Sequence, residues 1–265
     1  MTVDFHTHVF PEKLAARALQ QLSDKSGGLR PLFDGTPEGL ANHMKSRGVD
    51  LAVVLSIATN ANQQRSVNDF AIAINNGQYP LIAFGSVFPS APDAADEIDR
   101  LARAGIKGVK FHPEYQGFFV DDEWMFPIYE RIASLGMITV FHAGADIGFP
   151  KPIHSSPKRI ARALPHFGGA PVVAAHFGGY ISWDEVEEHL VGRDVYFDTS
   201  FCFGRIPFPQ AERIASMHGA GRLLFGSDLP WSDEIDELGL IERLHLSDGE
   251  LRQILSGNAL RLLNL

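Results

Sequence analysis

Short apolar segments recur along the chain, and each of them ends in a small or polar residue. Eight such segments are rich in β-branched and aromatic residues, and apolar side chains occupy consecutive positions in them. This pattern is typical of β-strands that are buried on both faces. The predicted strands begin near Val3, Leu51, Leu81, Gly108, Ile138, Pro171, Val195 and Leu223.

The stretches between these strands carry helical patterns. In residues 93–104, Ile98 and Leu101 lie on one apolar stripe at helical spacing. Ser182 and Ser247 are each followed three residues later by glutamate, which is the capping box expected at the start of a helix. Strands that alternate with helices predict parallel β–α–β units, and eight such units predict an α/β protein with a single (β/α)8 TIM barrel. An open, doubly wound sheet is the alternative fold.

The length of the chain agrees with a barrel. A TIM barrel usually takes about 250 residues, and the 265 residues here therefore predict one barrel domain over residues 1–265. The longest interval between predicted strands runs from Val3 to Leu51 and contains the sequence Ser-Gly-Gly at residues 26–28. We expect an elaboration there, in the form of a long loop after the first strand that lies near the barrel mouth as a lid.

Composition and charge restrict the partners. The formal net charge of -9 and the pI of about 5.6 argue against nucleic acid, which needs a clustered basic face. No apolar run reaches the roughly 18 residues of a membrane helix, and no signal peptide precedes the first strand. Cys202 is the only cysteine, which fits a reducing compartment. We expect a cytoplasmic protein that binds a small-molecule substrate, without nucleic-acid or membrane partners; a homodimer is compatible with these properties.

Histidines gather at the carboxyl ends of the predicted strands. His6 and His8 lie two residues apart, so a strand places both on one face. Lys110 and His112 repeat this spacing on the fourth strand, and His142 ends the fifth. In a TIM barrel all these ends meet on the face where active sites form.

His176 at the end of the sixth strand and Asp228 after the eighth complete this group. A single histidine in an apolar strand is usually a hydrogen-bonded core residue. Several imidazoles together with one carboxylate are instead what a divalent transition metal requires, and zinc is the most common fit. The pattern therefore predicts a metal site at the barrel mouth.

The motifs around these residues resemble the signature of the amidohydrolase superfamily, in particular its amidohydrolase-2 branch of TIM-barrel metal hydrolases, which is related to metal-dependent aromatic-acid decarboxylases. They occur in the order found in that branch and extend from the fourth residue almost to the last. The matching segments are DFHTH at 4–8, GVKFHP at 108–113, FHAG at 141–144, AHFGG at 175–179, FGSD at 225–228 and the C-terminal GNALRLL at 257–263.

The resemblance implies a role for each matched residue. His6, His8, His142 and Asp228 correspond to the ligands of one divalent metal ion, usually Zn²⁺, with Mn²⁺ as the alternative. His176 corresponds to a histidine that usually lies beside the metal-bound water and is in some members a metal ligand itself. Asp228 also corresponds to the proton acceptor, so Asp228 and His176 are the expected catalytic residues.

The remaining candidates have open roles. In some branches a lysine at the position of Lys110 is carboxylated and bridges two metals, but resemblance to this branch favours a plain ammonium that pairs with an inner carboxylate or binds substrate. His112 is a site residue without a defined role. His154, Arg205 and Trp231 follow predicted strands and are candidates for substrate contacts, with ordinary rim packing as the alternative. Arg205 can bind a substrate carboxylate with two parallel hydrogen bonds.

Three functions remain open from the sequence. The first is hydrolysis of a small amide, ester, lactone or related bond, because a metal lowers the pKa of water towards about 7 and a carboxylate can take its proton. The second is non-oxidative decarboxylation of an aromatic or unsaturated acid by the same residues; the compact chain favours the hydrolase, since decarboxylases of the family tend to be longer. The third is a catalytically silent barrel that binds a ligand, and the complete set of costly buried polar residues counts against it.

Overall fold

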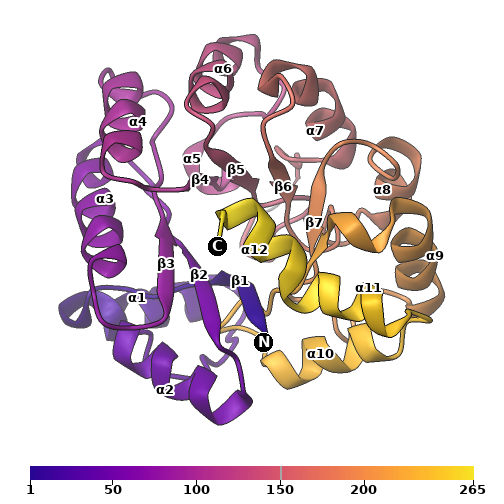
Figure 1. Cartoon of the computed structure of the whole chain (residues 1–265). Helices are drawn as coiled ribbons and strands as arrows, with labels where there is room; N and C mark the ends of the chain where they lie inside the picture. Colours follow the sequence, from indigo (N-terminus) through magenta and orange to yellow (C-terminus); the bar gives the residue numbers. More distant parts are fainter. Residues whose placement is uncertain (150) are drawn as a thin grey trace.

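The computed structural model describes residues 1–149 and 151–265, in which eight parallel strands form a ring surrounded by helices (Figure 1). The strands are β1 (Val3–Thr7), β2 (Leu51–Leu55), β3 (Leu81–Phe84), β4 (Gly108–Phe111), β5 (Ile138–Phe141), β6 (Val172–Ala174), β7 (Tyr196–Asp198) and β8 (Leu223–Leu224). The α-helices are α1 (Glu12–Lys25), α2 (Pro37–Arg47), α3 (Ala61–Asn75), α4 (Ala94–Arg103), α5 (Pro113–Gln116), α6 (Phe126–Ser134), α7 (Pro157–Ala163), α8 (Trp183–His189), α9 (Phe208–His218), α10 (Glu234–Glu242), α11 (Asp248–Arg252) and α12 (Asn258–Leu263). None of these described helices is long and apolar enough to cross a membrane.

Backbone hydrogen bonds close the strand ring at two seams. Strands β1 to β3 form one hydrogen-bonded sheet, and β4 to β8 form another. The amide of Gly85, just after β3, donates to the carbonyl of Gly108 over 3.0 Å, and the amide of Lys110 donates back to Gly85 over 2.8 Å. At the other seam the amide of Asp228 donates to the carbonyl of His6 over 2.8 Å. The predicted closed barrel is confirmed, and the open sheet is excluded.

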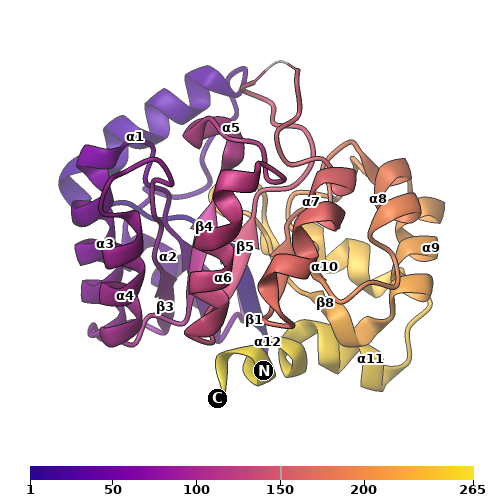
Figure 2. The same cartoon turned by 90° about the horizontal axis from the view of Figure 1, so that it is seen from above.

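An apolar layer fills the inside of the ring below the polar residues. Phe5, Val53 and Phe84 pack there together with Ala259 and Leu263 of α12. Figure 1 shows α12 crossing the ring, and Figure 2 shows both chain termini at the end of the barrel where the strands begin. The C-terminal helix therefore covers the floor of the barrel, and the opposite end, where the strands finish, carries the polar residues.

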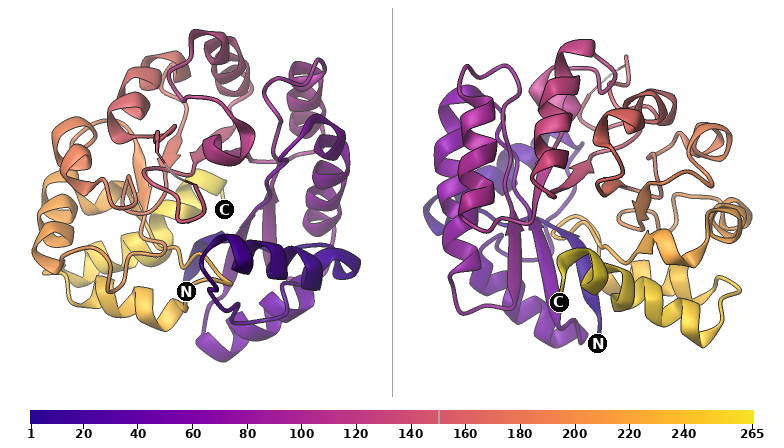
Figure 3. Two further views of the ribbon diagram at one scale, coloured as in Figure 1. Left: turned by 180° about the vertical axis from the view of Figure 1, so that it is seen from behind. Right: turned by 45° about the horizontal axis from the view of Figure 1, so that its top comes forward.

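The interval between β1 and β2 is helical, so the prediction of a long loop there is wrong. Helices α1 and α2 occupy most of it, and α2 begins at a cap in which the Thr36 hydroxyl accepts from the amide of Gly39 over 2.9 Å. The expected approach to the mouth does occur, because Lys25 at the end of α1 lies over the rings of Tyr115 and Phe149 at 5.0 and 5.6 Å. Figure 3 shows α1 along the rim opposite α12.

The two predicted capping boxes have different outcomes. At the start of α11, the Ser247 hydroxyl accepts from the amide of Glu250 over 3.3 Å, and the Ser247 amide donates to the Glu250 carboxylate over 2.8 Å. Helix α8 also begins where predicted, but Ser182 makes no capping bond with its side chain. The backbone of Ser182, with φ -115° and ψ 29°, lacks the extended conformation that capping requires.

A β-bulge in β1 turns His6 towards the barrel axis. The register with β2 shifts between Asp4 and Thr7, so β1 carries one extra residue there. Regular alternation would put Phe5 and His6 on opposite faces. Instead Phe5 lies in the inner apolar layer and His6 also points inward, where its ring contacts Asp198 at the end of β7. Bulges are a common device for redirecting a side chain next to a site.

Candidate metal centre

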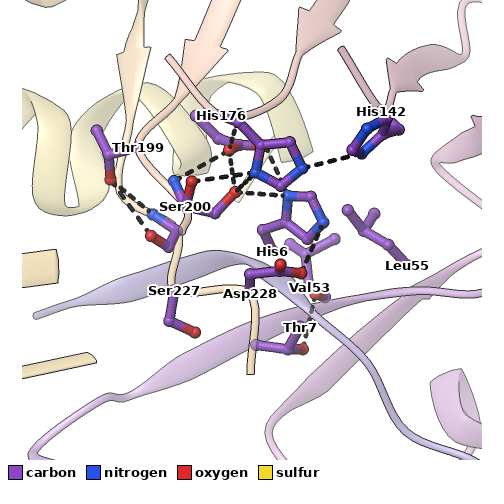
Figure 4. A network of polar contacts seen from close by, with 12 residues as sticks. His6, Thr7, Val53, Leu55, His142, His176, Thr199, Ser200, Ser227 and Asp228 are labelled. Atoms are coloured by element: carbon purple, nitrogen blue, oxygen red, sulfur yellow. Dashed lines mark hydrogen bonds and ion pairs between the residues drawn. The ribbon is translucent and has the colours of Figure 1, made fainter. Parts of the chain in front are cut away.

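The metal-binding residues implied by the sequence meet where the strands finish, and three of them form a compact group. The ligating atoms of His6, His8 and Asp228 lie within 4.8 Å of one another. The Nε2 atom of His8 is 3.0 Å from Oδ1 of Asp228. The Nε2 atom of His6 is 3.4 Å from the same oxygen (Figure 4). Asp228 itself adopts a left-handed backbone conformation with φ 73°, which aspartate tolerates better than most residues. The turn after β8 thus delivers a carboxylate to the two imidazoles of β1.

Hydrogen bonds on the far sides of the two imidazoles leave the facing nitrogens without a proton. His8 Nδ1 donates to the carbonyl of Leu55 over 2.9 Å, and His6 Nδ1 donates to the carboxylate of Asp198 over 2.9 Å. In a neutral imidazole this makes Nε2 an acceptor, and both Nε2 atoms face the Asp228 carboxylate. Acceptors this close repel one another unless a cation or a proton lies between them. The donor set therefore fits a divalent metal ion.

His142 and His176 present a second pair of facing nitrogens. His142 Nε2 donates to the carbonyl of Ala145 over 3.1 Å, and His176 Nδ1 donates to the carbonyl of Ser200 over 3.0 Å. The two remaining nitrogens are acceptors that lie 3.1 Å apart. The His176 ring centroid is 5.2 Å from that of His6, so this pair borders the three-residue group. His142 does not itself join the group within 4.8 Å among the described residues, and its role as a ligand stays a prediction.

Burial keeps the imidazoles in the form that binds metal. Burial lowers the pKa of His6 to about 3, the charge of Lys110 acts in the same direction, and Asp198 opposes both. Burial likewise lowers the pKa of His142 well below its ordinary value. For Asp228, burial raises the pKa, but the contact with the His8 ring acts in the opposite direction and the pKa falls to about 2. At neutral pH the site thus combines neutral His6 and His142 with an ionised carboxylate.

Lys110 lies inside the barrel without a salt bridge. Its side chain is 1% exposed, and its Nζ is 3.4 Å from Nε2 of His6. Within the described residues, no salt bridge joins Lys110 to a carboxylate. One of the two expected roles, direct pairing with an inner carboxylate, is therefore not observed. Burial lowers the pKa of Lys110 to about 8, and the charges of Asp198 and Asp228 partly offset this from a longer distance.

Asp198 is a site residue that the sequence analysis missed. Its Oδ2 accepts from His6 Nδ1, and its Oδ1 accepts from the amides of His176 and Ser200 over 3.0 and 3.1 Å and from the Ser200 hydroxyl over 2.5 Å. Burial raises the pKa of Asp198, but the adjacent His6 brings it below its ordinary value. Its position at the end of a buried strand could have identified Asp198 as a candidate from the sequence. It was not considered because it lies outside the motifs that resemble the amidohydrolase signature.

The structure brings His112 to the site and leaves His154 further out. The rings of His112 and His142 stack with their centroids 4.2 Å apart, and His112 Nε2 is 3.3 Å from Asp146 Oδ2. His154 is 23% exposed in its side chain, and its Nδ1 is 3.9 Å from the carboxylate of Glu114. Burial raises the pKa of Glu114 to about 7. His112 therefore borders the metal group, whereas His154 contacts a carboxylate behind it.

Trp231 and Arg205 lie in the loops after β8 and β7. The amide of Trp231 donates to the carbonyl of Asp228 over 2.9 Å, and its half-buried indole packs against the apolar core. Trp231 thus closes the turn that presents Asp228. The guanidinium of Arg205 lies 3.6 Å above the ring of Phe201, and Nη1 donates to the carbonyl of Phe203 over 3.1 Å.

The sequence match agrees with this geometry. A family model described as Amidohydrolase (Amidohydro_2) matches residues 3–265. The chain belongs to this amidohydrolase family. The match runs through all the motifs of the predicted resemblance, so that prediction is confirmed. No curated protein matches the sequence of this amidohydrolase.

Solved structures share the fold of this amidohydrolase over nearly its whole length. A TIM-barrel protein from Bordetella bronchiseptica has a TM-score of 0.79 at 21% identity, covering 99% of this chain and 98% of that one. The 5-carboxyvanillate decarboxylase of Sphingomonas paucimobilis has a TM-score of 0.72 at 17% identity, covering 100% and 99%. A dihydroxybenzoic acid decarboxylase from Polaromonas, with bound manganese and an inhibitor, has a TM-score of 0.71 at 15% identity, covering 100% and 97%. At these identities the likeness shows the fold.

A buried carboxyl group fastens the loops on one side of the mouth. Glu237 of α10 is 0% exposed. Its Oε2 accepts from the amides of Cys202 and Phe203 over 3.1 and 2.9 Å, and its Oε1 accepts from the Ser232 hydroxyl over 2.6 Å. Burial raises the pKa of Glu237 to about 7, although these hydrogen bonds act in the opposite direction. Glu237 thus ties the loop after β7 to the loop after β8.

Replacing Glu237 by glutamine is expected to remove part of the pH dependence of stability. The glutamine oxygen can accept from both backbone amides, and its NH₂ group, which cannot ionise, can donate to the Ser232 hydroxyl in place of the bond that Ser232 donates in wild type. Because the pKa of Glu237 is raised in the folded chain, the folded state holds this proton more tightly, and the wild-type free energy of unfolding should fall as the pH rises from about 4.5 through 7. At pH 8 the variant should gain up to about 3 kcal/mol relative to wild type, and at pH 4.5 almost nothing.

Urea denaturation at pH 4.5, 6 and 8 measures this difference. Glu242→Gln, at the exposed end of the same helix α10, is the control. If the free energy of unfolding changes with pH in the same way in wild type and Glu237→Gln, then the pKa of Glu237 is the same in the folded and unfolded chains, and the prediction is wrong.

Proposed function

We propose that the protein is a metal-dependent hydrolase that uses an activated water on a small amide, ester, lactone or related bond. The observation that carries this proposal is the setting of Asp228. Its Oδ1 faces the two imidazoles of β1, its Oδ2 has no hydrogen-bond partner among the described residues, and its side chain is 13% exposed. An ionised carboxylate in this position can accept the proton of a water molecule and return it to a leaving group.

One divalent metal ion would be held by His6, His8 and Asp228, with His142 as the further ligand expected from the family match. Two imidazoles and a carboxylate suit Zn²⁺. Mn²⁺ is the alternative, and the similar decarboxylase from Polaromonas supports it because that protein contains manganese. Such an ion, when bound, lowers the pKa of water and polarises a carbonyl oxygen.

The surrounding residues would then orient and stabilise the reacting groups. His176 has its Nδ1 tied to Ser200, so its Nε2 can accept a hydrogen bond from the attacking water. The ammonium of Lys110, buried beside His6, contributes positive charge in a water-poor site, where it would favour negative charge that develops on a substrate oxygen. Asp198 holds the ring of His6 and the backbone of His176 in place.

Non-oxidative decarboxylation of an aromatic or unsaturated acid is the second candidate. The likeness to the 5-carboxyvanillate and dihydroxybenzoic acid decarboxylases favours it. The alignments extend over 99% and 97% of those two chains, whereas the compact length of the present chain remains the argument for the hydrolase. The same metal group would serve both, and in decarboxylation a nearby acid would protonate the carbon.

Metal analysis and a substrate screen together test the proposal. Protein purified without chelator is expected to hold about one zinc or manganese per chain and to hydrolyse members of a panel of esters, lactones and amides. Release of carbon dioxide from aromatic acids without any hydrolysis would instead establish the second candidate. A metal content well under one per chain after addition of either metal would contradict both and leave the catalytically silent barrel.

A further inference from the structure

We propose that the indole N–H of Trp183 positions the ring of His176 by holding the backbone carbonyl of that residue. Trp183 would contact no reacting group and would act only through His176, as a positioning residue. Because the proposed function places His176 beside the attacking water, this role of Trp183 in the reaction rests on that function.

His176 lies in a turn whose backbone conformation is unfavourable. The φ angles are 60° at His176, 55° at Phe177 and 84° at Gly178. Left-handed φ angles are disfavoured for residues that carry a side chain, and two of these three residues carry one. The turn therefore depends on contacts with its surroundings to keep this shape, and the direction of the His176 ring depends on the turn.

Backbone amides of the turn donate several of these contacts. The amide of His176 donates to Oδ1 of Asp198 over 3.0 Å, and the amide of Phe177 donates to the carbonyl of Asp198 over 2.7 Å. The amide of Gly179 donates to the carbonyl of His176 over 3.2 Å. A carbonyl oxygen has two lone pairs, so the carbonyl of His176 can accept from one further donor.

Trp183 supplies this further donor. Its Nε1 donates to the carbonyl of His176 over 3.1 Å, and the side chain is buried at the start of α8. A buried indole N–H requires an acceptor in any protein core. Here the acceptor belongs to the residue whose ring borders the metal group. Loss of this bond would leave the peptide group between His176 and Phe177 less firmly held.

Glycines bring α8 close enough for this bond. A Cβ atom at Gly178 would come within 3.0 Å of the side chain of Val186 on α8, and one at Gly179 within 3.1 Å of the same side chain. Between them and the helix, Ile181 also has a left-handed backbone, with φ 58°, which is unusual for a β-branched residue. The chain thus turns back on itself, and the indole of Trp183 meets a carbonyl seven positions earlier.

The ring of His176 depends on the turn for its tautomer as well as its direction. Its Nδ1 donates to the carbonyl of Ser200 over 3.0 Å, and its Nε2 lies 3.1 Å from Nδ1 of His142 (Figure 4). The bond to Ser200 keeps the proton on Nδ1 and leaves Nε2 as an acceptor. If the peptide group after His176 rotates, the ring moves with it and this bond is lost.

Trp183→Phe tests the role of the N–H, because phenylalanine keeps an aromatic ring but has no donor. In metal-free wild type, nitrogen-15 spectra of the histidine rings are expected to show His176 with its proton on Nδ1. In the variant this signal should give way to a mixture with the Nε2–H form. On the best substrate of the screen, kcat should fall at least about tenfold with KM little changed, since a small misplacement of a reacting group can cost about 10²-fold.

Val186→Ala is the matched control, because it removes packing of the same helix on the same turn but keeps the N–H of Trp183. It should lower Tm and leave the tautomer of His176 unchanged. If Trp183→Phe does not fold, 3-benzothienylalanine in place of Trp183 gives the same test, since its sulfur replaces the N–H in a ring of nearly the same shape.

The inference is overturned by a wild-type protein with the His176 proton on Nε2, or by a folded Trp183 variant that keeps the wild-type tautomer. It is also overturned if Val186→Ala changes the tautomer to the same extent. The spectra require no turnover, so they separate this inference from the proposed function. A variant with a changed tautomer and wild-type kcat would remove His176 from the reaction. A chain that hydrolyses nothing, but whose His176 tautomer depends on Trp183, refutes the proposed function and leaves the positioning of His176 standing.

Discussion

Replacing Asp228 by asparagine is expected to lower kcat/KM by about 10²- to 10⁴-fold, the usual contribution of a general base. The amide has the shape of the carboxylate but cannot accept a proton from water, and it brings no negative charge to His6 and His8. The fold should persist, because asparagine tolerates the left-handed φ of 73° at this position. Steady-state kinetics on the best substrate of the screen, with metal content measured in parallel, gives the result.

Asp233→Asn is the control for the loss of a charge on the same side of the barrel. Asp233 caps α10 through a hydrogen bond from the amide of Ile235 and pairs with Arg47, and asparagine can also cap. Activity should stay close to wild type in this variant. Near-normal turnover of Asp228→Asn would remove Asp228 from the reaction, whichever bond the enzyme breaks.

Replacing Asp198 by asparagine is expected to weaken metal binding by at least about tenfold, the lower end of the range for residues that orient a metal ligand. Three donors, the amides of His176 and Ser200 and the Ser200 hydroxyl, converge on Oδ1 of Asp198, so the single oxygen of asparagine should take that place. Its NH₂ group would then face Nδ1 of His6. The His6 proton would have to move from Nδ1 to Nε2, the atom proposed to bind the metal.

Competition with a chromophoric chelator measures the zinc affinity of this variant. Nitrogen-15 spectra of the histidine rings report the second expected change, a proton on Nε2 of His6 in the metal-free variant and on Nδ1 in wild type. Ser200→Ala removes one donor to Asp198 and a hydroxyl that lies 3.0 Å from Nδ1 of His6, but it leaves the Asp198 oxygen that accepts the His6 proton, so the His6 tautomer should stay that of wild type. An Asp198→Asn protein with wild-type affinity and the wild-type tautomer would show that Asp198 only packs the barrel.

The strands could be located from the sequence because a strand that is buried on both faces has apolar residues at consecutive positions. Consecutive apolar residues followed by a glycine, proline or histidine identify a strand without knowledge of its partners. Strands β1 and β4, predicted to begin near Val3 and Gly108, begin at those residues. The sequence pattern of helices α1 and α2 is weaker, because each buries only a narrow face. The buried residues are Ala15 and Leu19 on α1, and Leu40 and Met44 on α2. The glycines between them suggested a loop for the whole interval.

By itself, then, the sequence determined the barrel and the order of the polar residues on its rim, because spacing along a strand fixes which side chains share a face. The tertiary structure alone decided which of them meet. The bulge in β1 turns His6 inward, and the partner of His6, Asp198, lies 192 positions away in the chain. It also put the guanidinium of Arg205 over the ring of Phe201. Such contacts depend on how strands pair and loops fold back, and no local pattern of residues encodes them.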